Sequence, residues 1–359
     1  MKKYAVIGLM SGTSLDGLDV AYVEFIRDNN WSFNTIECKT LKYGVDLDAR
    51  LRDASNLSAI ALKRLDIDFG KWIGEQVKQF INKKGVRPDL IASHGHTIFH
   101  QPEIGITMQI GDGNQIMLQT GIKTISDFRA LDVANGGQGA PLVPIGDKFL
   151  FSNYDLCLNL GGFSNVSMEH QGERIAFDIC PVNTVLNHLS GILGKPFDKN
   201  GAIAKTGKVN PKLLAALNAL PYYQQAPPKS LGIEWVQKNI FPIMIGDKPE
   251  NLLATYCQHV ADQVINAVLY IMKEQNTEPK MLVTGGGAHN TFLIESIKKE
   301  ALGRLNIVIP ENQIVDFKEA IIFAFLGVLR SLNEINTLKS VTGAKTSSSG
   351  GTVFDSLIA

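Results

Sequence analysis

A polar, glycine-rich turn near the start of the chain contains the first residues that could do chemistry. Residues 8–19 read GLMSGTSLDGLD and lie between two runs predicted as strands, Tyr4 to Ile7 and Val20 to Phe25. The small residues would let backbone N–H groups approach a polyphosphate and cradle it. Asp16 and Asp19 add carboxylates that could hold Mg2+ directly or through water.

Two common phosphate-binding motifs are excluded for this turn, and a plain hairpin turn is the alternative. The chain contains no G-x-x-x-x-G-K-[ST] sequence, which excludes a Walker loop. A strand is predicted to follow the turn, where the dinucleotide fingerprint requires a helix. Because short glycine motifs over-predict ligand sites, the interpretation depends on the rest of the chain.

Two acidic residues are further candidates. Asp178 follows a predicted strand, Arg174 to Phe177, and precedes a predicted helix, Thr184 to Leu193. A carboxylate between a strand end and a helix start can be aimed into a cleft, and the alternative role for an aspartate there is a helix N-cap. Glu319 lies one turn into a predicted helix, Asp316 to Asn333, where a solvated glutamate is the commoner case.

Three histidines follow another predicted strand, Asp89 to Ser93. They are His94, His96 and His100, in a segment predicted as a loop at the C-terminal end of that strand. Ligands of α/β sheets bind at such ends. Clustered histidines can bind zinc, but hydrogen bonding to a polar ligand or to the loop itself is the interpretation that we favour.

Two glycine-rich segments complete the set of candidates. Asp127 to Leu142 reads DFRALDVANGGQGAPL, and we interpret it as a substrate loop with Arg129 as its cation; a long domain connection is the alternative. Gly285 to Gly287 separate a predicted strand, Met281 to Thr284, from a helix that ends near Ala301. This arrangement lets a ring or a phosphate lie against the backbone at the positive end of a helix.

The elements that would position these residues follow from hydrophobic periodicity. A long helix, Ser58 to Lys84, has its apolar residues on one face and ends at Gly85. Small residues at one face of the C-terminal helix predict close packing there: Ala320, Ala324 and Gly327. The proline-rich stretch Tyr222 to Lys229 is predicted as an exposed excursion, and the tail from Thr342 to Gly351 as mobile. Further strands are predicted over residues 31–43, 107–110 and 123–126, and a helix over 252–273.

The chain repeats its opening plan in its second half. A strand over residues 155–160, a turn that contains Gly161 and Gly162, and strands over 166–170 and 174–177 match the order of residues 4–25. Such a repeat predicts a duplicated fold in which each half begins with a hairpin. Two such turns facing each other across a cleft would hold a nucleotide's phosphates from both sides.

Length and charge narrow the class of protein. The chain has 359 residues, which predicts two domains. Lys+Arg and Asp+Glu are equal at 35 each, which argues against nucleic acid or an anionic membrane as the main partner. No apolar run reaches the roughly 18 residues of a membrane span. Four cysteines without C-x-x-C spacing indicate reduced thiols in a cytoplasmic protein.

Taken in their order, these segments resemble the anhydro-N-acetylmuramic acid kinase family of the actin/hexokinase/sugar-kinase superfamily. The motifs that carry the resemblance span nearly the whole chain: GLMSGTSLDGLDVAYVEF at 8–25, SHGHTIFH at 93–100, QIGDGN at 109–114, DFRALDVANGGQGAPLVP at 127–144, NLGGFSNV at 159–166, GKPFDKNG at 194–201 and VTGGGAHN at 283–290. The first and the fourth are long and specific.

The resemblance implies an α/β fold with a particular architecture. This is a two-domain, duplicated actin-like ATPase fold of ribonuclease H-like topology, with ATP and the sugar in the interdomain cleft. We expect an N-terminal domain over residues 1–145, which the C-terminal tail could complete, and a C-terminal domain over 146–359. The family also implies Mg2+ with the ATP, an amino-sugar substrate and a homodimer.

The resemblance also implies a role for individual residues. Asp178 falls on the family's catalytic aspartate. The sugar would be contacted by Ser11, His94, Arg129 and Glu319. The nucleotide would be bound by a larger set: Gly12, Thr13, Ser14, Leu15, Asp16, Gly17, Leu18, Asp19, Gly161, Gly162, Gly285, Gly286 and Gly287.

The family reaction joins hydrolysis to phosphoryl transfer. Water opens the anhydro bridge of 1,6-anhydro-N-acetylmuramic acid, and the freed O6 takes the γ-phosphoryl group of ATP to give N-acetylmuramic acid 6-phosphate. Because phosphorus captures the leaving oxygen, one carboxylate, Asp178, suffices as base. Two alternatives stay open: a kinase of the same fold for another amino sugar or hexose, and a non-catalytic ATP-dependent sensor.

The chain departs from the family pattern at a few positions. Where the family usually reads F-D-T-G-P-G-N, residues 177–183 read FDICPVN. Cys180 and Val182 thus replace two glycines, and we expect them to fill space beside the sugar. His96 replaces a usual glutamine, and the serine-rich tail also differs.

Overall fold

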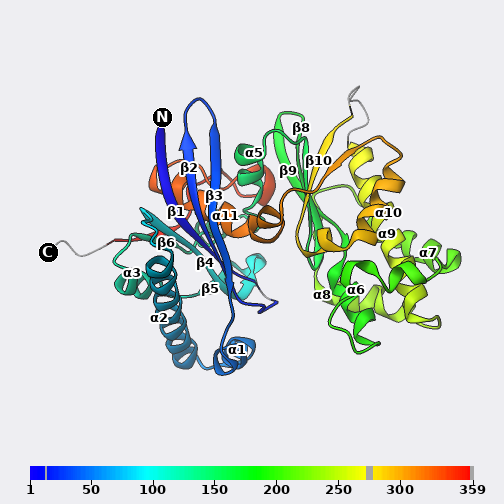
Figure 1. The fold of residues 1–359 in the computed structure, drawn as a ribbon, viewed down its shortest axis with the longest axis horizontal. Coiled ribbons are helices and arrows are strands. Elements are labelled where there is room, and N and C mark those ends of the chain that lie inside the picture. Colours follow the sequence, from blue (N-terminus) through cyan, green and yellow to red (C-terminus); the bar gives the residue numbers. More distant parts are fainter. Residues whose placement is uncertain (13, 272–277, 356–359) are drawn as a thin grey trace. The chain divides into compact units, whose positions relative to one another are not determined.

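The computed structural model describes residues 1–12, 14–271 and 278–355, and the chain divides into two compact units (Figure 1). The first unit contains Met1–Leu150 and Phe317–Ala359, and the second contains Phe151–Asp316. The expected division into domains over residues 1–145 and 146–359 stays a prediction.

The first unit is built on a seven-stranded sheet. Its order is β12-β6-β4-β1-β2-β3, with β5 paired to β4. The strands β1, β2 and β3 form an antiparallel meander, and β4 and β6 extend it in parallel to β1. The strand bounds are β1 Lys2–Ser11, β2 Leu18–Arg27, β3 Trp31–Leu41, β4 Leu90–Gln101, β5 Ile106–Ile110, β6 Thr124–Ser126 and β12 Thr352–Phe354.

The long helix α2 (Ala59–Lys84) covers one face of this sheet. Its Leu65 and Phe69 join Ile7 and Leu9 of β1 in a hydrophobic cluster. The helix begins after Ser58, whose side chain caps it, and ends at Gly85, which adopts a φ of 65°. Both helix ends lie where the sequence predicts them.

The helix α11 (Asn312–Ser331) packs closely on the opposite face, because Gly8 alternates with Ile7 and Leu9 along β1. A Cβ added at Gly8 would overlap the carbonyl oxygen of Ala320 and lie 2.8 Å from the Cβ of Ala324. One added at Gly327 would lie 2.6 Å from the Cβ of Ala92. The predicted close packing of the small-residue face is confirmed.

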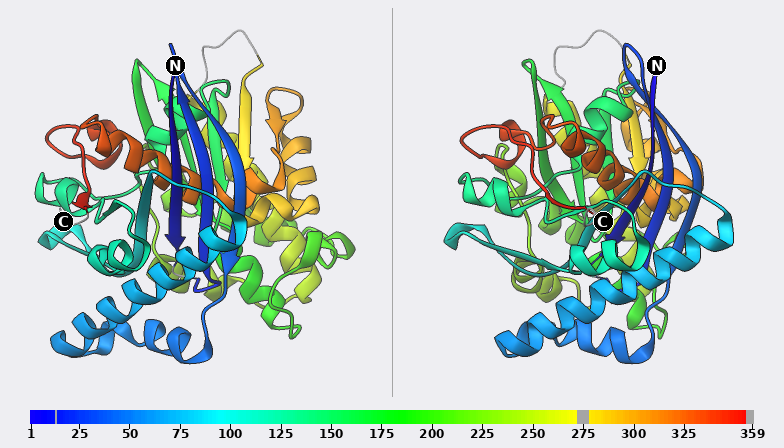
Figure 2. Two further views of the ribbon diagram at one scale, coloured as in Figure 1. Left: turned by 60° about the vertical axis from the view of Figure 1, so that its left-hand side comes forward. Right: turned by 90° about the vertical axis from the view of Figure 1, so that its left-hand side faces the viewer.

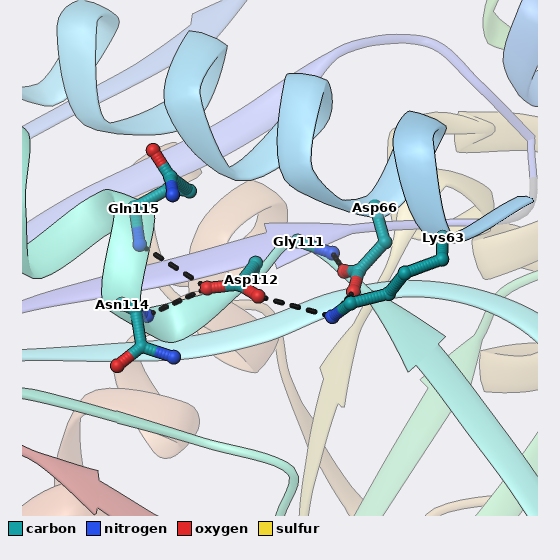
Figure 3. A network of polar contacts seen from close by, with 6 residues as sticks. All are labelled: Lys63, Asp66, Gly111, Asp112, Asn114 and Gln115. Atoms are coloured by element: carbon teal, nitrogen blue, oxygen red, sulfur yellow. Dashed lines mark hydrogen bonds and ion pairs between the residues drawn. The ribbon is translucent and has the colours of Figure 1, made fainter. Parts of the chain in front are cut away.

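Short helices complete the first unit, and a polar network joins α2 to one of them (Figure 3). Asp66 accepts hydrogen bonds from the N–H of Gly111 and from Nζ of Lys63, each at 2.7 Å. Asp112 accepts from two N–H groups in the first turn of α3 and from the same lysine. These bonds fix the QIGDGN segment after β5. The short helices are α1 Val45–Arg52, α3 Gly113–Thr120, α4 Ala130–Ala134, α5 Pro144–Leu150 and α12 Lys339–Thr342.

The second unit repeats the plan of the first. Its five-stranded sheet has the order β11-β10-β7-β8-β9. Again the first three strands form an antiparallel meander, and the next two extend it in parallel. The duplicated α/β fold of actin-like, ribonuclease H-like topology is therefore confirmed. The strands are β7 Leu156–Leu160, β8 Phe163–His170, β9 Glu173–Pro181, β10 Lys280–Thr284 and β11 Asn306–Val308.

Helices of the second unit pack on this sheet through one hydrophobic core. Val260 of α9, Ile297 of α10 and Leu186 of α6 meet strand residues there. Cys180 and Val182 belong to the same core and are fully buried, so their side chains fill space inside this unit; their position beside a sugar stays a prediction. The helices are α6 Asn183–Gly191, α7 Pro211–Asn218, α8 Ile233–Asn239, α9 Pro249–Ile271 and α10 Thr291–Ala301. No helix in the described ranges has the length and apolar character needed to cross a membrane.

The predicted histidine loop is part of a strand. β4 continues through His94 and His100 to Gln101, because β5 pairs with its outer half. The prediction of a loop there is wrong, since polar residues and Gly95 do not prevent a strand whose backbone groups find partners.

The serine-rich tail is ordered against the first unit. In both views of Figure 2 the red C-terminal segment lies on the same unit as the blue N-terminal strands, and β12 pairs with β6. The buried side chain of Asn336 bonds to the backbone N–H and C=O of Gly350, at 2.8 Å each. Thr337 and Ser348 form a β-bridge. The prediction of a mobile tail is wrong because these bonds tie it down.

Candidate functional site

The β1–β2 turn presents open backbone and polar side chains. The carbonyl of Gly12 accepts a hydrogen bond from the N–H of Leu15 at 3.1 Å. A Cβ added at Gly12 would meet only the hydroxyl of Ser14, at 3.6 Å, so a ligand can reach this backbone. Ser14 and Asp16 are exposed, and the carboxylate of Asp16 has no hydrogen-bond partner among the described residues. Thr13 lies outside the described residues.

Packing and hydrogen bonding within the first unit account for the types of the other residues in the turn. Leu15 is buried in the core at a φ of 59°, and Leu18 is fully buried. A Cβ added at Gly17 would lie 2.7 Å from the carbonyl oxygen of Leu41, so the approach of β3 requires glycine. Asp19 accepts a hydrogen bond from a threonine hydroxyl of β3 at 2.6 Å. Leu15, Gly17 and Leu18 could therefore contact a nucleotide through their backbone atoms alone.

Ser11 ends β1 in a buried hydrogen-bonded chain. Its Oγ accepts from the hydroxyl of Tyr43 at 2.7 Å and lies 2.9 Å from Nδ1 of His96. Ser11 Oγ and His96 Nδ1 share one hydrogen bond, whose direction depends on the ring tautomer of His96. Burial raises the pKa of Tyr43 to about 12 and lowers the pKa of His96. Tyr43 and His96 are therefore both uncharged near pH 7.

His94 and Arg129 form a directed pair. Nε2 of His94 accepts from Nε and Nη2 of Arg129 at 3.0 and 2.9 Å, and its Nδ1 donates to the carbonyl of Gly95 at 2.9 Å. Burial and the charge of Arg129 lower the pKa of His94 well below its ordinary value. Burial lowers the pKa of Arg129 to about 10, although Glu319 and Asp132 oppose this shift. Near pH 7 the arginine is thus a cation and the histidine is neutral.

Glu319 joins this pair from α11. Loss of solvation around the carboxylate raises the pKa of Glu319, and the charges of Arg129 and then Lys318 oppose this shift. The structure thus gathers three of the predicted sugar-binding residues, His94, Arg129 and Glu319, in the first unit. Their contact with a sugar stays a prediction.

The loop after Arg129 is held by a residue that sequence reasoning missed. Nη1 of Arg129 donates to the carbonyl of Gly139 at 2.7 Å. Asp132, which is buried, accepts from the N–H of Gly139 and from the hydroxyl of Thr342, at 2.8 Å each. Asp132 therefore fixes the carbonyl that positions Arg129. The available signal was a second carboxylate within a glycine-rich segment.

Five glycines predicted to bind the nucleotide come together in the second unit, around the end of β7: Gly161, Gly162, Gly285, Gly286 and Gly287. A Cβ added at Gly287 would lie 2.7 Å from the Cβ of Leu160, so close packing requires glycine there. One added at Gly286 would meet only Nδ2 of Asn183, at 3.5 Å. Gly286 therefore presents backbone that a ligand can approach.

The helix starts near these glycines are already capped. Carbonyls of Gly161 and Gly162 accept from N–H groups of residues 182–184 at the start of α6. A single 3-10 turn, η7 (Gly286–His289), begins at the second of the three glycines, and the side chain of Asn290 caps α10 after it. The predicted order of a strand, three glycines and a helix that ends at Ala301 is confirmed, and contact of these glycines with a nucleotide stays a prediction.

Asp178 lies inside β9, and Val182 occupies the N-cap position of α6. Both the predicted position at a strand end and the N-cap alternative are thus wrong, because β8 pairs with β9 as far as Pro181. Between the pairs Asn165–Asp178 and Ser164–Cys180 the strand has one extra residue. Such bulges re-aim neighbouring side chains and are common next to active sites.

The carboxylate of Asp178 has one oxygen held and one free. Oδ2 accepts from the N–H of Leu231 at 2.9 Å, and Oδ1 has no hydrogen-bond partner among the described residues. Burial raises the pKa of Asp178, and the bond from Leu231 opposes this shift. A fixed carboxylate with a free oxygen and a raised pKa meets the requirements of a general base.

The predicted excursion around Tyr222 packs onto Asp178. Tyr222 is buried, and its hydroxyl donates to the carbonyl of Asp178 at 2.7 Å. The N–H of Asp178 donates to the carbonyl of Lys229 at 3.1 Å. The prediction of an exposed segment is wrong for Tyr222, because this ring and the backbone that follows it hold the candidate base. The aromatic pair Tyr222–Tyr223 among the prolines was the available signal.

The candidate residues thus form two groups, one in each unit. The turn after Ser11 and the Arg129 group belong to the first unit, and Asp178 and the glycine cluster belong to the second. In the first unit, open backbone at Gly12 and the carboxylate of Asp16 are groups of the kind that bind a phosphate or its divalent cation. In the second unit, open backbone at Gly286 could likewise donate to a phosphate. Over the described ranges, no group of three His, Cys, Asp or Glu side chains could hold a metal.

Comparison with known proteins matches the whole chain to one family. A family model described as anhydro-N-acetylmuramic acid kinase covers residues 4–356. The chain is 34% identical to the anhydro-N-acetylmuramic acid kinase of Mannheimia succiniciproducens, over 99% of both chains. It is 36% identical to the protein of the same name from Shewanella putrefaciens, over 96% of both chains.

Solved structures resemble the chain more distantly. Component A of the Acidaminococcus fermentans (R)-2-hydroxyglutaryl-CoA dehydratase is 13% identical, with a TM-score of 0.47 over 92% of this chain and 99% of that one. The ROK hexokinase of Thermus thermophilus is also 13% identical, with a TM-score of 0.40 over 91% of this chain and 100% of that one.

Proposed function

The chain belongs to the anhydro-N-acetylmuramic acid kinase family, and from this premise we propose that it converts 1,6-anhydro-N-acetylmuramic acid, ATP and water to N-acetylmuramic acid 6-phosphate and ADP. The observation that carries the assignment of roles is the free Oδ1 of Asp178, on a carboxylate that Leu231 fixes and burial makes more basic. One such base suffices, because the oxygen that leaves carbon is captured by phosphorus.

The proton and bond changes follow from that base. Oδ1 of Asp178 takes a proton from water as the water oxygen bonds to C1 of the sugar. The bond between C1 and O6 breaks, and O6 bonds to the γ-phosphorus while the bond to the ADP oxygen breaks. No general acid is needed, since the negative charge passes from O6 to ADP.

Arg129 supplies the charge for sugar recognition in this proposal. The substrate carries a lactyl carboxylate, and a planar guanidinium pairs well with such a group. His94 and the carbonyl of Gly139 use several of its N–H groups and fix its plane. Glu319 and Ser11 would accept from or donate to the sugar's remaining polar groups.

Both units would contribute to the nucleotide. The backbone of Gly12 and Ser14 in the first unit and of Gly286 in the second would donate to phosphate oxygens. Asp16 and Asp19 would help to hold Mg2+, which usually takes one or two carboxylates and keeps phosphate and water ligands. When bound, the ion neutralises charge on the transferring phosphoryl group. A cytoplasmic location and a homodimer complete the proposal.

One coupled assay tests this function. ADP release is measured with the full chain, Mg2+ and ATP, with 1,6-anhydro-N-acetylmuramic acid present or absent. We expect release that depends on the anhydro sugar. Phosphorylation of ordinary N-acetylglucosamine but not of the anhydro sugar would support a kinase for another amino sugar, and release that no sugar changes would support the sensor.

A further inference from the structure

The second unit contains a polar cavity that the proposed reaction does not use. Its volume is about 330 Å³, which is within the range of small-ligand sites. Phe177 and Ile179, the neighbours of Asp178 in β9, form part of its wall. Asn218 of α7, residues of α9 and residues from the segment 223–229 form the rest, and Asp178 is not among them.

An amide oxygen without a hydrogen-bond donor among the described residues faces this cavity. Gln263 is 7% exposed, and its Nε2 donates to Oδ1 of Asn218 at 3.0 Å. Its Oε1 has no partner among the residues that the structure describes. Because this oxygen is open to the cavity and has a lone pair to offer, a ligand N–H or O–H group or a water molecule can donate to it.

Neighbouring bonds fix the direction in which Gln263 points. Nδ2 of Asn218 donates to Asp262 at 2.7 Å, so its Oδ1 is the acceptor for Gln263 and for Nδ1 of His259, 2.6 Å away. Burial lowers the pKa of His259 to about 3, and its unprotonated Nε2 accepts from the hydroxyl of Tyr223 at 3.0 Å. The amide of Gln263 must therefore turn its NH2 to Asn218 and its oxygen away from it.

A cation without a counter-ion lines the same cavity. Lys229 is half-buried, and its Nζ lies 3.3 Å from the carbonyl oxygen of Tyr222 and 4.7 Å from the centre of that ring. Within the described ranges no carboxylate pairs with it. Side-chain amides of Gln224, Gln225 and Asn266 add further donors and acceptors to the wall.

We propose that this cavity is a second ligand site, for a small monoanion that also bears amide or hydroxyl groups. The carboxylate of the ligand would pair with Lys229, and an N–H or O–H group would donate to Oε1 of Gln263. Carboxylated N-acetyl amino sugars have this chemistry. The site is separate from the proposed reaction, because none of the residues assigned to that reaction lines it.

Calorimetric titration of the full chain without nucleotide tests the proposal. The probes are N-acetylmuramic acid and N-acetylglucosamine, which lacks the carboxylate. We expect N-acetylmuramic acid to bind, and N-acetylglucosamine to bind at least about tenfold more weakly because it cannot pair with Lys229. Gln263→Leu and Lys229→Met should each weaken N-acetylmuramic acid binding by about tenfold or more.

The matched control is Arg129→Met, which removes the cation of the first unit. It should leave this binding event in place and abolish sugar-dependent ADP release. Gln263→Leu should instead weaken this binding event and keep normal sugar-dependent ADP release. Its far-UV circular dichroism spectrum should match that of the wild type. Unchanged binding in both cavity variants, or loss of all binding in Arg129→Met, would overturn the second site. Absence of ADP release from the wild type would instead overturn the proposed function alone.

Discussion

At the scale of single residues, the chemistry depends on the free oxygen of Asp178. An amide at this position cannot take a proton, although its oxygen can still accept from Leu231. We therefore expect Asp178→Asn to fold and bind ATP but to lower the turnover number by about 1,000-fold or more, the upper part of the acid–base range. Sugar-dependent ADP release measures the loss, and near-normal turnover would refute the assignment.

The raised pKa of Asp178 predicts the pH dependence. The base works only when ionised, so kcat/KM should fall as the pH decreases through this pKa, at a pH above the ordinary value near 3.8. Because the pKa of Asp178 is higher in the folded protein than in the unfolded chain, folding favours the protonated carboxyl group. This contribution to stability is fully present below the unfolded pKa and is lost as the pH rises through the folded pKa. At pH 7 the ionised group thus opposes folding, and Asp178→Asn should melt no lower than the wild type. A lower melting temperature would contradict this sign.

Asp132 should position Arg129 without touching the sugar. Asp132→Asn places an NH2 group against one of two donors, the N–H of Gly139 or the hydroxyl of Thr342. We expect a loss of about 1–3 kcal/mol in the free energy of unfolding, and a raised KM for the sugar because the Gly139 carbonyl shifts. Thr342→Val is the control: it removes the bonds of the threonine hydroxyl to Asp132 and to the carbonyl of Leu338 but keeps the bond between Asp132 and Gly139. It should destabilise the protein with little change in KM. If Asp132→Asn and Thr342→Val had the same KM for the sugar, Asp132 would contribute to stability alone and would not position Arg129.

Residue types and motifs revealed only part of the candidate site. Asp178 and Arg129 could be found because a carboxylate and a cation stand in segments unlike ordinary loops. Leu231 could not, because it acts through its backbone N–H, which has no signature in its side chain. Tyr222 was hidden for a related reason: its hydroxyl meets Asp178 only after the chain folds back. Contacts of this kind depend on tertiary structure.

At the scale of elements, the packing of α11 on β1 sets a strict limit on side-chain size. A Cβ at Gly8 would overlap the carbonyl oxygen of Ala320, and neither backbone can move alone. We expect Gly8→Ala to lower the free energy of unfolding by about 1–3 kcal/mol or more, as overpacked cores do. Urea denaturation measures the loss. Gly44→Ala is the control, because no atom lies within 4 Å of its added Cβ, and a loss of equal size there would contradict the steric explanation.

Element types were easier to predict than element ends. The core helix α2 has a strong apolar period and cap residues at both ends, so its bounds follow from local sequence. β4 runs past its predicted end because its outer half gains β5 as a partner. The tail is ordered because β12 finds β6, although its serines and glycines have weak local preference. Long-range pairing decides such cases, and a single sequence does not display it.

At the scale of the whole molecule, duplication gives each unit a strand, a glycine turn and a second strand. The turns at Gly12 and at Gly161 follow the first strand of their sheets, which occupies the same place in both strand orders. If both turns serve one nucleotide, its binding must protect segments of both units from exchange with solvent. Binding to one unit alone would leave the other unchanged.

Hydrogen exchange of the full chain distinguishes these outcomes. The ligand is a non-hydrolysable ATP analogue with Mg2+, at about 100 times its Kd. Local opening of the segments that contact it should become up to about 100-fold rarer, which raises the free energy of opening by about 2.7 kcal/mol. We expect slower exchange around Gly12 in the first unit and around Gly161 and Gly286 in the second. The β8–β9 turn at Gly172 lies at the other end of β8 from Gly162 and should not change. Slowing in the first unit alone would mean that the glycines of the second unit serve only the close packing around Leu160.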